Sequence, residues 1–461
     1  WSKIGEIFLA QANFPKAEHA HGKVILLNPD SFEGWSGLAK AFCEQGKFVQ
    51  EANALEKAHA LNPPNIRVSQ KLFEAFLRMG NRGKAYQLLL QSKWEKYPKS
   101  LLLKVGQLYM DYGEISRALE CFDKLIENGS LIEEALFLKG NAMVTTKQFK
   151  SAVSLYSDAL KYRPDWPEAY SNLVNSKAFL CDWQERTIEI EKLQELVAKN
   201  KLHGGAFELA GLYHSPEEEA DFCTRRAAEV LNRTKKISEK LKLTHETGKK
   251  EKKRIGFLSA DFRNHAVGHA MIGLLENLCQ KKFELFLYST SGDDGTEITK
   301  EFRDISPNFI DLTSLNLRQI AVKINSDGLD LLVDLGGFSR GHNAELLALH
   351  PAPRQVHFLG YAASMGKGLV DFAIADRFVI PASSSQFFGE KIIRMNGCFF
   401  PPGKFDGFAK RSKRAEVGLP ARGVVYCAFH AAYKLDPDIW ACWMRILKAV
   451  PESVLWLKFK P

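Results

Sequence analysis

The sequence predicts an α-helical solenoid followed by an α/β region built on a parallel sheet. Two observations lead to this prediction. In the first third of the 461-residue chain, similar residues recur every 33 or 34 positions. From Lys253 onward, short continuous apolar runs alternate with helical stretches, as in a parallel sheet that helices cover on both faces. Hydrophobic residues make up 45% of the chain, which is enough to pack both regions.

The repeats have the period of the tetratricopeptide, a pair of helices that stacks on its neighbours. Residues of one kind lie 34 apart in the pairs Trp1 and Trp35, Gly5 and Ala39, Phe8 and Phe42, Pro29 and Pro63, and Phe122 and Tyr156. Small residues such as Gly106 and Gly140 let two helices approach closely, and aromatic residues fill the space between pairs. One pair cannot bury its apolar face, so about five pairs must stack. We expect repeats over 1–180, weakest in the third, where Pro98 falls one residue late.

The segment 181–252 keeps a helical pattern but loses the period. Apolar spacing predicts amphipathic helices over 185–197 and 217–230, which we interpret as a cap on the solenoid. A basic stretch follows, with ten Lys or Arg and three Asp or Glu between 231 and 254. It lacks the interleaved aromatic residues of a nucleic-acid surface, so we expect a solvated, mobile connector and no nucleic-acid partner.

Composition excludes several other classes of protein. No apolar run approaches the ~18 residues that cross a bilayer, and the chain does not start like a signal peptide, so we expect no membrane association. The eight cysteines are scattered, without a CxxC pair or a Cys/His cluster. They indicate reduced thiols in the cytoplasm and no metal site. Because the chain begins at Trp1, we expect it to be part of a longer protein.

The α/β region divides into two units, 253–415 and 416–461. Strands of the first unit are predicted at 254–260, 283–289, 329–335, 355–360, 370–375 and 391–395, with helices at 270–279 and 317–326. The second unit has a strand at 424–429, a helix near 438–449 and a strand at 454–459. A doubly wound domain needs more residues than the second unit has, so we expect it to be only begun in this chain.

Functional groups of such sheets lie at the carboxyl ends of the strands. Asp261 and His265 follow the first predicted strand, and a histidine can take up a proton near neutral pH. On spacing alone, His265 is equally well explained as a helix-start residue satisfied by its own turn. His269, one turn later, is better explained as structural.

The signatures of two common nucleotide enzymes are missing. The sequence has neither GxGxxG nor GxxxxGK[ST], which argues against a dinucleotide oxidoreductase and an ATPase. Lys434, however, lies between a strand and a helix of the second unit, where its ammonium group and the helix N-terminus can neutralise a phosphate. A solvated loop lysine is the plainer interpretation.

Five longer motifs occur in order along the chain. They are DFRNH (261–265), SGDDGT (291–296), LHPAPRQVHFLGY (349–361), VVYCAFHAAYKLDP (424–437) and VPESVLWLK (450–458). Together they resemble the protein O-linked N-acetylglucosamine transferase family, which includes the plant SPINDLY proteins. The resemblance covers essentially the whole chain.

The resemblance implies tetratricopeptide repeats followed by a glycosyltransferase B (GT-B) fold of two Rossmann-like lobes. The first lobe would be 253–415, and 416–461 would begin the second. The implied reaction is the metal-independent, inverting transfer of N-acetylglucosamine from UDP-GlcNAc to Ser or Thr hydroxyls of proteins. It would need no cofactor besides the nucleotide sugar. Acceptor proteins or peptides would bind along the repeats and in the catalytic cleft.

The resemblance also assigns roles to residues. Its base or substrate-orienting histidine falls on His265, beside Asp261 and Asn264, and its phosphate lysine falls on Lys434. Six residues are expected to contact the substrates: Asn264, His269, Leu359, Gly360, Tyr361 and Ser364. An oxocarbenium-like centre and a departing diphosphate both need the charge stabilisation that such groups supply.

Three departures from the family pattern keep alternatives open. The Pro-Gly-Thr of the acceptor loop is Ala362-Ala363-Ser364 here, and a glutamine is replaced by Ala431. A further histidine of the animal enzymes has no clear counterpart within 203–207, and the family's nucleotide-base residues would lie beyond Pro461. A protein O-fucosyltransferase that uses GDP-fucose therefore remains possible, as does a repeat scaffold with an inactive transferase domain.

Overall fold

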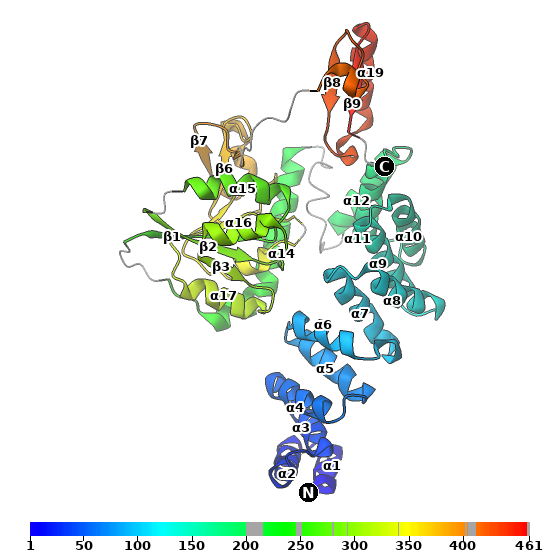
Figure 1. Ribbon diagram of the computed structural model, residues 1–461, viewed down its shortest axis with the longest axis vertical. Helices are drawn as coiled ribbons and strands as arrows, with labels where there is room; N and C mark the ends of the chain where they lie inside the picture. Colours follow the sequence, from blue (N-terminus) through cyan, green and yellow to red (C-terminus); the bar gives the residue numbers. More distant parts are fainter. Residues whose placement is uncertain are drawn as a thin grey trace. The chain divides into compact units, whose positions relative to one another are not determined.

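The computed structural model describes residues 1–199, 215–245, 251–278, 281–292, 294–339, 341–401, 403 and 412–458 (Figure 1). The spatial contacts between Cα atoms divide the chain into two compact units. One comprises 1–135 with 313–320, and the other 136–312 with 321–461. The segment 203–207, where no counterpart of the further histidine was expected, lies outside the described residues.

The first unit consists mainly of paired helices, as the 34-residue period predicts. They are α1 (Ser2–Ala10), α2 (Phe14–Leu27), α3 (Phe32–Glu44), α4 (Phe48–Leu61), α5 (Ile66–Arg78), α6 (Arg82–Gln91), α7 (Lys99–Asp111) and α8 (Ile115–Glu127). Polar side chains start several of them; the Ser31 hydroxyl, for example, accepts the Gly34 N–H at 3.0 Å. Gly106 packs on the ring of Phe122, where a Cβ atom would lie 2.5 Å from a ring carbon. The small residues thus allow the close helix contacts expected of them.

The third pair departs from the pattern, as predicted. Helix α6 has 10 residues, whereas α2 and α4 have 14 each. A short 3-10 helix, η1 (Trp94–Lys96), follows it, and Trp94 and Tyr97 are buried. Pro98 is the N-cap of α7. The ring of Trp94 packs near Tyr109 and that of Tyr97 near Phe73. Proline fits the start of the next helix because its missing N–H needs no partner there.

The second unit continues with helices and then a sheet. Its helices before the sheet are α9 (Ile132–Thr145), which spans the boundary between the units, α10 (Phe149–Tyr162), α11 (Pro167–Phe179), α12 (Arg186–Lys199) and α14 (Pro216–Leu241). Gly140 packs on Tyr156 as Gly106 packs on Phe122. The repeat pattern was predicted to end near 180, and α11 ends at Phe179.

The prediction of a mobile basic connector from 231 is wrong for its first part. Helix α14 continues through that part to Leu241, and Thr234 is buried, its hydroxyl donating to the Val230 carbonyl at 2.9 Å. Lysine and arginine are good helix formers, so a basic stretch can extend a helix that is anchored by buried residues. Residues 246–250 of the predicted connector lie outside the described part of the chain.

A parallel sheet of seven strands forms the first lobe. The strands are β1 (Lys253–Ser259), β2 (Phe283–Ser289), β3 (Asn308–Asp311), β4 (Leu331–Asp334), β5 (Gln355–His357), β6 (Phe372–Asp376) and β7 (Lys391–Met395). Their order in the sheet is β3-β2-β1-β4-β5-β6-β7. Six of the seven were predicted. Strand β3 was not, because this edge strand is short and polar at both ends.

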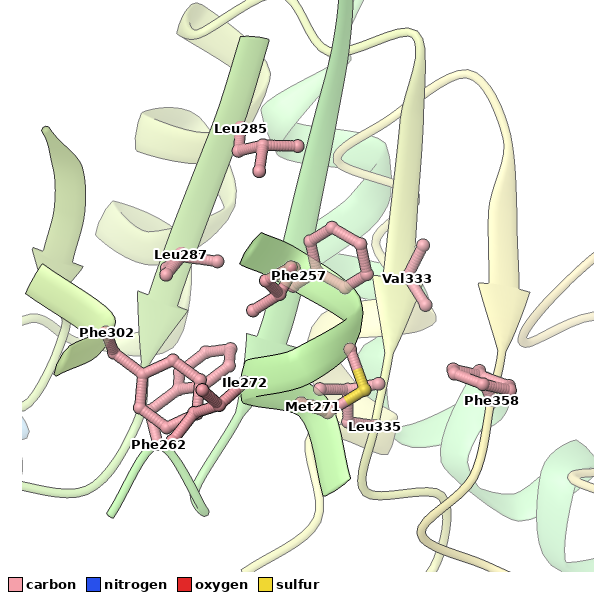
Figure 2. Packing of buried hydrophobic residues seen from close by; sticks show 11 residues of the cluster. Phe257, Phe262, Met271, Ile272, Leu285, Leu287, Phe302, Val333, Leu335 and Phe358 are labelled. Carbon is pink, nitrogen blue, oxygen red and sulfur yellow. The ribbon is translucent and has the colours of Figure 1, made fainter. Parts of the chain in front are cut away.

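Four helices alternate with these strands: α15 (Ala266–Asn277), α16 (Glu297–Ile305), α17 (Leu317–Ser326) and α18 (Ala344–Leu347). Two 3-10 helices, η2 (Ala382–Phe387) and η3 (Arg414–Val417), follow later in the chain. Figure 2 shows the core in which Met271 and Ile272 of α15 pack against strand residues such as Phe257 and Val333. This core fixes α15 on the sheet, and so fixes the loop that joins it to β1.

The second lobe has one β-α-β unit in this chain. It consists of β8 (Val425–Ala428), the 3-10 helix η4 (Ala432–Lys434), α19 (Pro437–Ala449) and β9 (Val454–Leu457), with β8 and β9 parallel. No residue of α19 is buried, and Phe429 and Trp456 are exposed. Part of the apolar surface of these two strands and one helix is therefore exposed, while Trp440 of α19 packs near Trp183.

Candidate functional site

His265 stands at the start of α15, just beyond the carboxyl end of β1. It is the N-cap of the helix, and its Nδ1 accepts the Val267 N–H at 3.3 Å. The same nitrogen lies 3.4 Å from Oδ2 of Asp261. These contacts are alternatives: neutral Nδ1 accepts the backbone N–H, and protonated Nδ1 faces the carboxylate. The side chain of His265 is 44% exposed, so the ring is accessible to a substrate.

The Asp261 carboxylate is more enclosed than the histidine that it faces, with 13% of its side chain exposed. Its backbone N–H donates to the buried Ser259 hydroxyl at 2.9 Å, which ties the loop to the end of β1. Arg263 lies on its other oxygen at 3.4 Å. The loop and helix also meet closely: a Cβ atom on Gly268 would lie 2.4 Å from the Arg263 carbonyl oxygen. Only glycine permits that approach.

Asn264 and His269 complete the cluster. The Asn264 side-chain oxygen lies 3.0 Å from Nε2 of His269. The Asn264 backbone N–H donates to Oδ2 of Asp294 at 3.0 Å. Burial opposes ionisation of Asp294, but hydrogen bonds from Thr296, Asn264 and Thr299 outweigh it and lower the pKa of this carboxyl. Asp294 is therefore an ionised anchor for the loop.

Sequence reasoning did not assign a role to Asp294. A signal was present, because Asp294 stands two residues before Thr296 and accepts its N–H at 3.1 Å, a local turn that aspartate favours. The contact with Asn264, thirty residues away, could not be read from spacing.

The segment predicted to bind sugar and acceptor borders this cluster. A Cβ atom on Gly360 would lie 3.6 Å from a methyl group of Val267, the residue whose N–H donates to the N-cap side chain of His265. Leu359 has φ +73°, which a residue with a side chain rarely adopts. The loop after β5 thus lies beside the first turn of α15.

Tyr361 and Ser364 of the same segment face inward. Both are buried, and the Ser364 hydroxyl donates to Oε2 of Glu390 at 2.6 Å. Glu390 also accepts the Met365 N–H. In this structure Ser364 holds the loop in place, and its substrate contact stays a prediction.

Lys434 occupies the predicted kind of position. It ends η4, and three residues later α19 begins at Pro437, where the Asp436 carboxylate accepts the Ile439 N–H at 2.9 Å. The ammonium group is exposed and lies 6.0 Å from the centre of the Tyr433 ring. Among the described residues no hydrogen bond or ion pair joins Lys434 to the His265 cluster. The structure therefore brings together Asp261, Asn264, His265 and His269, and the role of Lys434 stays a prediction.

This arrangement can move a proton. With a proton on Nδ1 facing Asp261, the exposed Nε2 of His265 is free to accept one from a hydroxyl group. In the described residues, no three His, Cys, Asp or Glu side chains are grouped as metal ligands would be. No described helix has the length and apolar character needed to cross a membrane.

Family models match almost the entire chain. Glycosyl transferase family 41 matches residues 180–410 and 407–461. The tetratricopeptide repeat matches 3–66 and 103–171, leaving out most of the irregular third pair.

Individual relatives match a little under half of the chain at moderate identity. Three of them carry the name UDP-N-acetylglucosamine–peptide N-acetylglucosaminyltransferase. SEC of Arabidopsis thaliana, so named as probable, is 31% identical over 214 residues, 44% of this chain and 22% of its own. The Caenorhabditis elegans protein is 29% identical over 235 residues, which are 48% of this chain and 20% of its own. SPINDLY of Arabidopsis thaliana, also named as probable, is 29% identical over 213 residues, which are 45% of this chain and 23% of its own. The matches thus span about a fifth of each relative.

Among solved structures, a mutant of the Thermobaculum terrenum O-GlcNAc transferase is similar over 99% of this chain and 67% of its own. The sequence identity is 19% and the TM-score 0.49.

Proposed function

The chain belongs to glycosyl transferase family 41, and from this membership we propose that it transfers N-acetylglucosamine from UDP-GlcNAc to Ser or Thr hydroxyls of proteins. One observation carries the proposal beyond the family. The exposed His265 ring, backed by Asp261 at 3.4 Å, stands at the carboxyl end of β1. In open α/β sheets this is the edge where substrates bind.

The proposed reaction uses His265 as a general base. Nε2 takes the proton of the acceptor hydroxyl as its oxygen attacks the anomeric carbon, and the imidazolium that forms is stabilised by Asp261. The bond between the sugar and the diphosphate breaks on the opposite side, so the configuration inverts. We assign Lys434 to the charge that develops on the departing diphosphate. No metal or further cofactor has a part in this scheme.

The repeats supply the acceptor side of the proposal. Stacked tetratricopeptide helices form extended surfaces suited to polypeptides. We therefore infer that acceptor proteins bind there and present a hydroxyl to the His265 cluster. A cytoplasmic location, inferred from the scattered cysteines, fits the free thiols of the described residues and stays part of the proposal.

A donor comparison tests the function. The longest form of the protein that its gene encodes is incubated with an acceptor peptide library and labelled UDP-GlcNAc or GDP-fucose. We expect label from UDP-GlcNAc. Transfer from GDP-fucose alone would make the protein an O-fucosyltransferase, and transfer from neither donor would favour a scaffold with an inactive domain.

Two variants test the assigned roles. His265→Ala should lower the rate of transfer about 10²–10⁴-fold because it removes the base. Lys434→Ala should lower it about 10²–10³-fold because it removes a fixed positive charge. The exposed His19→Ala and Lys448→Ala serve as matched controls and should retain full activity. A His265→Ala protein with undiminished transfer would remove the proposed base.

A further inference from the structure

A buried aspartate and a buried histidine end two neighbouring strands beneath the loop 358–366. Asp334 is the last residue of β4, His357 is the last residue of β5, and the two are paired in register. Asp334 is 0% exposed and His357 is 4% exposed. The reaction proposed above gives a role to neither.

The His357 ring lies between a backbone carbonyl and a carboxylate, and only its Nε2 makes a hydrogen bond in the described structure. Its Nε2 lies 2.9 Å from the Tyr361 carbonyl oxygen, and its Nδ1 lies 3.5 Å from Oδ2 of Asp334. A carbonyl oxygen can only accept a hydrogen bond, so Nε2 carries a proton. Burial disfavours a charged ring, but Asp334, the Tyr361 carbonyl and the Glu390 carboxylate outweigh it and raise the pKa of His357.

Asp334 connects this ring to the loop that follows β4. Its Oδ2 accepts the Gly337 N–H at 2.6 Å, and its backbone carbonyl accepts the Phe358 N–H at 2.9 Å. Its Oδ1 is buried and has no hydrogen-bond partner in the described structure. A buried carboxylate with an unsatisfied oxygen lowers stability, so stability alone does not explain the pair.

The turn above the pair is strained. Leu359 has φ +73°, a backbone conformation that is unfavourable for a residue with a side chain. A Cβ atom on Gly360 would lie 1.9 Å from the Leu335 carbonyl oxygen, so the turn is pressed against the chain beyond β4. Such a backbone persists only where its surroundings fix it. The hydrogen bond from Nε2 of His357 to the Tyr361 carbonyl joins the two ends of this turn.

We propose that His357, oriented by Asp334, is a positioning residue that fixes the backbone of residues 359–361 beside His265. A Cβ atom on Gly360 would lie 3.6 Å from Val267, which follows His265 by two residues in the first turn of α15, so a shift of the turn changes the space next to the proposed base. The part of the inference that concerns the acceptor rests on the proposed function. The part that concerns the shape of the turn does not.

Two variants of His357 separate positioning from simple packing. His357→Gln keeps a side-chain N–H that can donate to the Tyr361 carbonyl, whereas His357→Leu fills space without a donor. Hydrogen exchange of the segment 356–366 is measured by mass spectrometry on the 461-residue chain. We expect exchange in His357→Leu to be at least tenfold faster than in the unchanged chain, and exchange in His357→Gln to stay within about threefold.

Kinetics on the longest encoded form complete the test. We expect His357→Leu to raise the KM for the acceptor peptide about tenfold, with the KM for the donor unchanged, and His357→Gln to restore most of the difference. Equal exchange in the two variants, or a change in the donor KM alone, would overturn the proposal.

If the protein transfers no sugar, the proposed function is wrong. The hydrogen-exchange measurement still tests the positioning role of His357. If His357→Leu does not fold, Asp334→Asn replaces it. This variant keeps an oxygen for the Gly337 N–H and removes the charge that orients His357, so it should speed exchange of 356–366 severalfold. Unchanged exchange in Asp334→Asn would then overturn the inference.

Discussion

Glycine has different neighbours in the repeat helices and at the edge of the parallel sheet. In the repeats, Cβ atoms added to Gly106 and Gly140 would lie 2.5 Å from the side-chain rings of Phe122 and Tyr156. At the sheet edge, a Cβ atom on Gly360 would lie 1.9 Å from a main-chain carbonyl oxygen. A ring can move when its neighbours adjust, but a main-chain oxygen moves only if the whole turn moves.

The difference indicates what each region is built for. In the repeats, glycine governs how tightly helices pack. A larger residue at such a position lowers the stability of the neighbouring helix pairs. At the sheet edge, glycine governs where backbone and polar groups lie. A larger residue at such a position displaces the candidate site. Substitutions in the two regions should therefore separate loss of activity from loss of stability.

The largest effect is expected for Gly360→Ala. The added carbon clashes with the Leu335 carbonyl, so the turn beside His265 must move by about 1 Å, which can cost about 10²-fold in rate. The rate of sugar transfer to an acceptor peptide is the measurement. Gly397→Ala, where a Cβ atom would meet nothing within 4 Å, is the control and should keep its activity. Full activity in Gly360→Ala would mean that the turn does not shape the site.

Gly140→Ala should affect stability instead. Its Cβ atom would press on the ring of Tyr156, and overpacking of this kind costs about 1–3 kcal/mol in the free energy of unfolding. Urea unfolding followed by circular dichroism measures the loss, and the transfer rate at low temperature should stay the same. A large fall in that rate without a fall in stability would erase the distinction between the two regions.

His21 tests the repeats through pH. It lies 34 residues before Leu55, and Cβ atoms on both Gly5 and Gly37 would meet its ring. Both ring nitrogens are buried without a hydrogen-bond partner in the described structure, and burial lowers the pKa of the ring. The unfolded chain therefore binds the proton more readily, and stability should fall as pH drops below about 6.5 towards the lowered value.

His21→Leu removes the contribution of this residue to the pH dependence of stability. We expect the variant to lose less stability between pH 7 and pH 5 than the unchanged chain, which loses at most about 1.4 kcal/mol per pH unit in that window through this residue. Thermal unfolding at a series of pH values, followed for each protein, provides the comparison. Identical pH profiles would show that the His21 ring reaches solvent when it takes up a proton.

The smallest effect is expected for Gly22→Ala, one residue further along α2. A Cβ atom at Gly22 would meet nothing within 4 Å, so the change only improves helix propensity. It should stabilise the chain by about 0.5–1 kcal/mol. Destabilisation at this position, measured by urea unfolding, would mean that the repeats tolerate no added carbon even where space is open.

Much of the fold could be predicted because it depends on local patterns. The period of 34 located the repeats, and predicted strands at 283–289 and 391–395 coincide with β2 and β7. Strand β3 could not be found this way, because an edge strand is defined by its pairing with β2. Helix α14 extends through a segment whose charges alone indicate a solvated connector.

The candidate site was predicted in part. Asp261 and His265 are four residues apart after a strand, so one turn of chain brings them together whatever the rest of the fold does. The contacts of Asn264 with Asp294 and of Asp334 with His357 join residues at least 23 positions apart. They form because parallel strands bring their carboxyl ends to one edge, which no local pattern records.

The sequence by itself determined the periodic helices, the alternation of strand and helix, and the polar residues that follow the first strand. These depend on spacing along the chain, and spacing is what a sequence contains. Only the tertiary structure decided which buried polar groups meet and which backbone is strained in the loop after β5. Burial and pairing arise when distant segments pack together, and the same residues have no such partners in the extended chain.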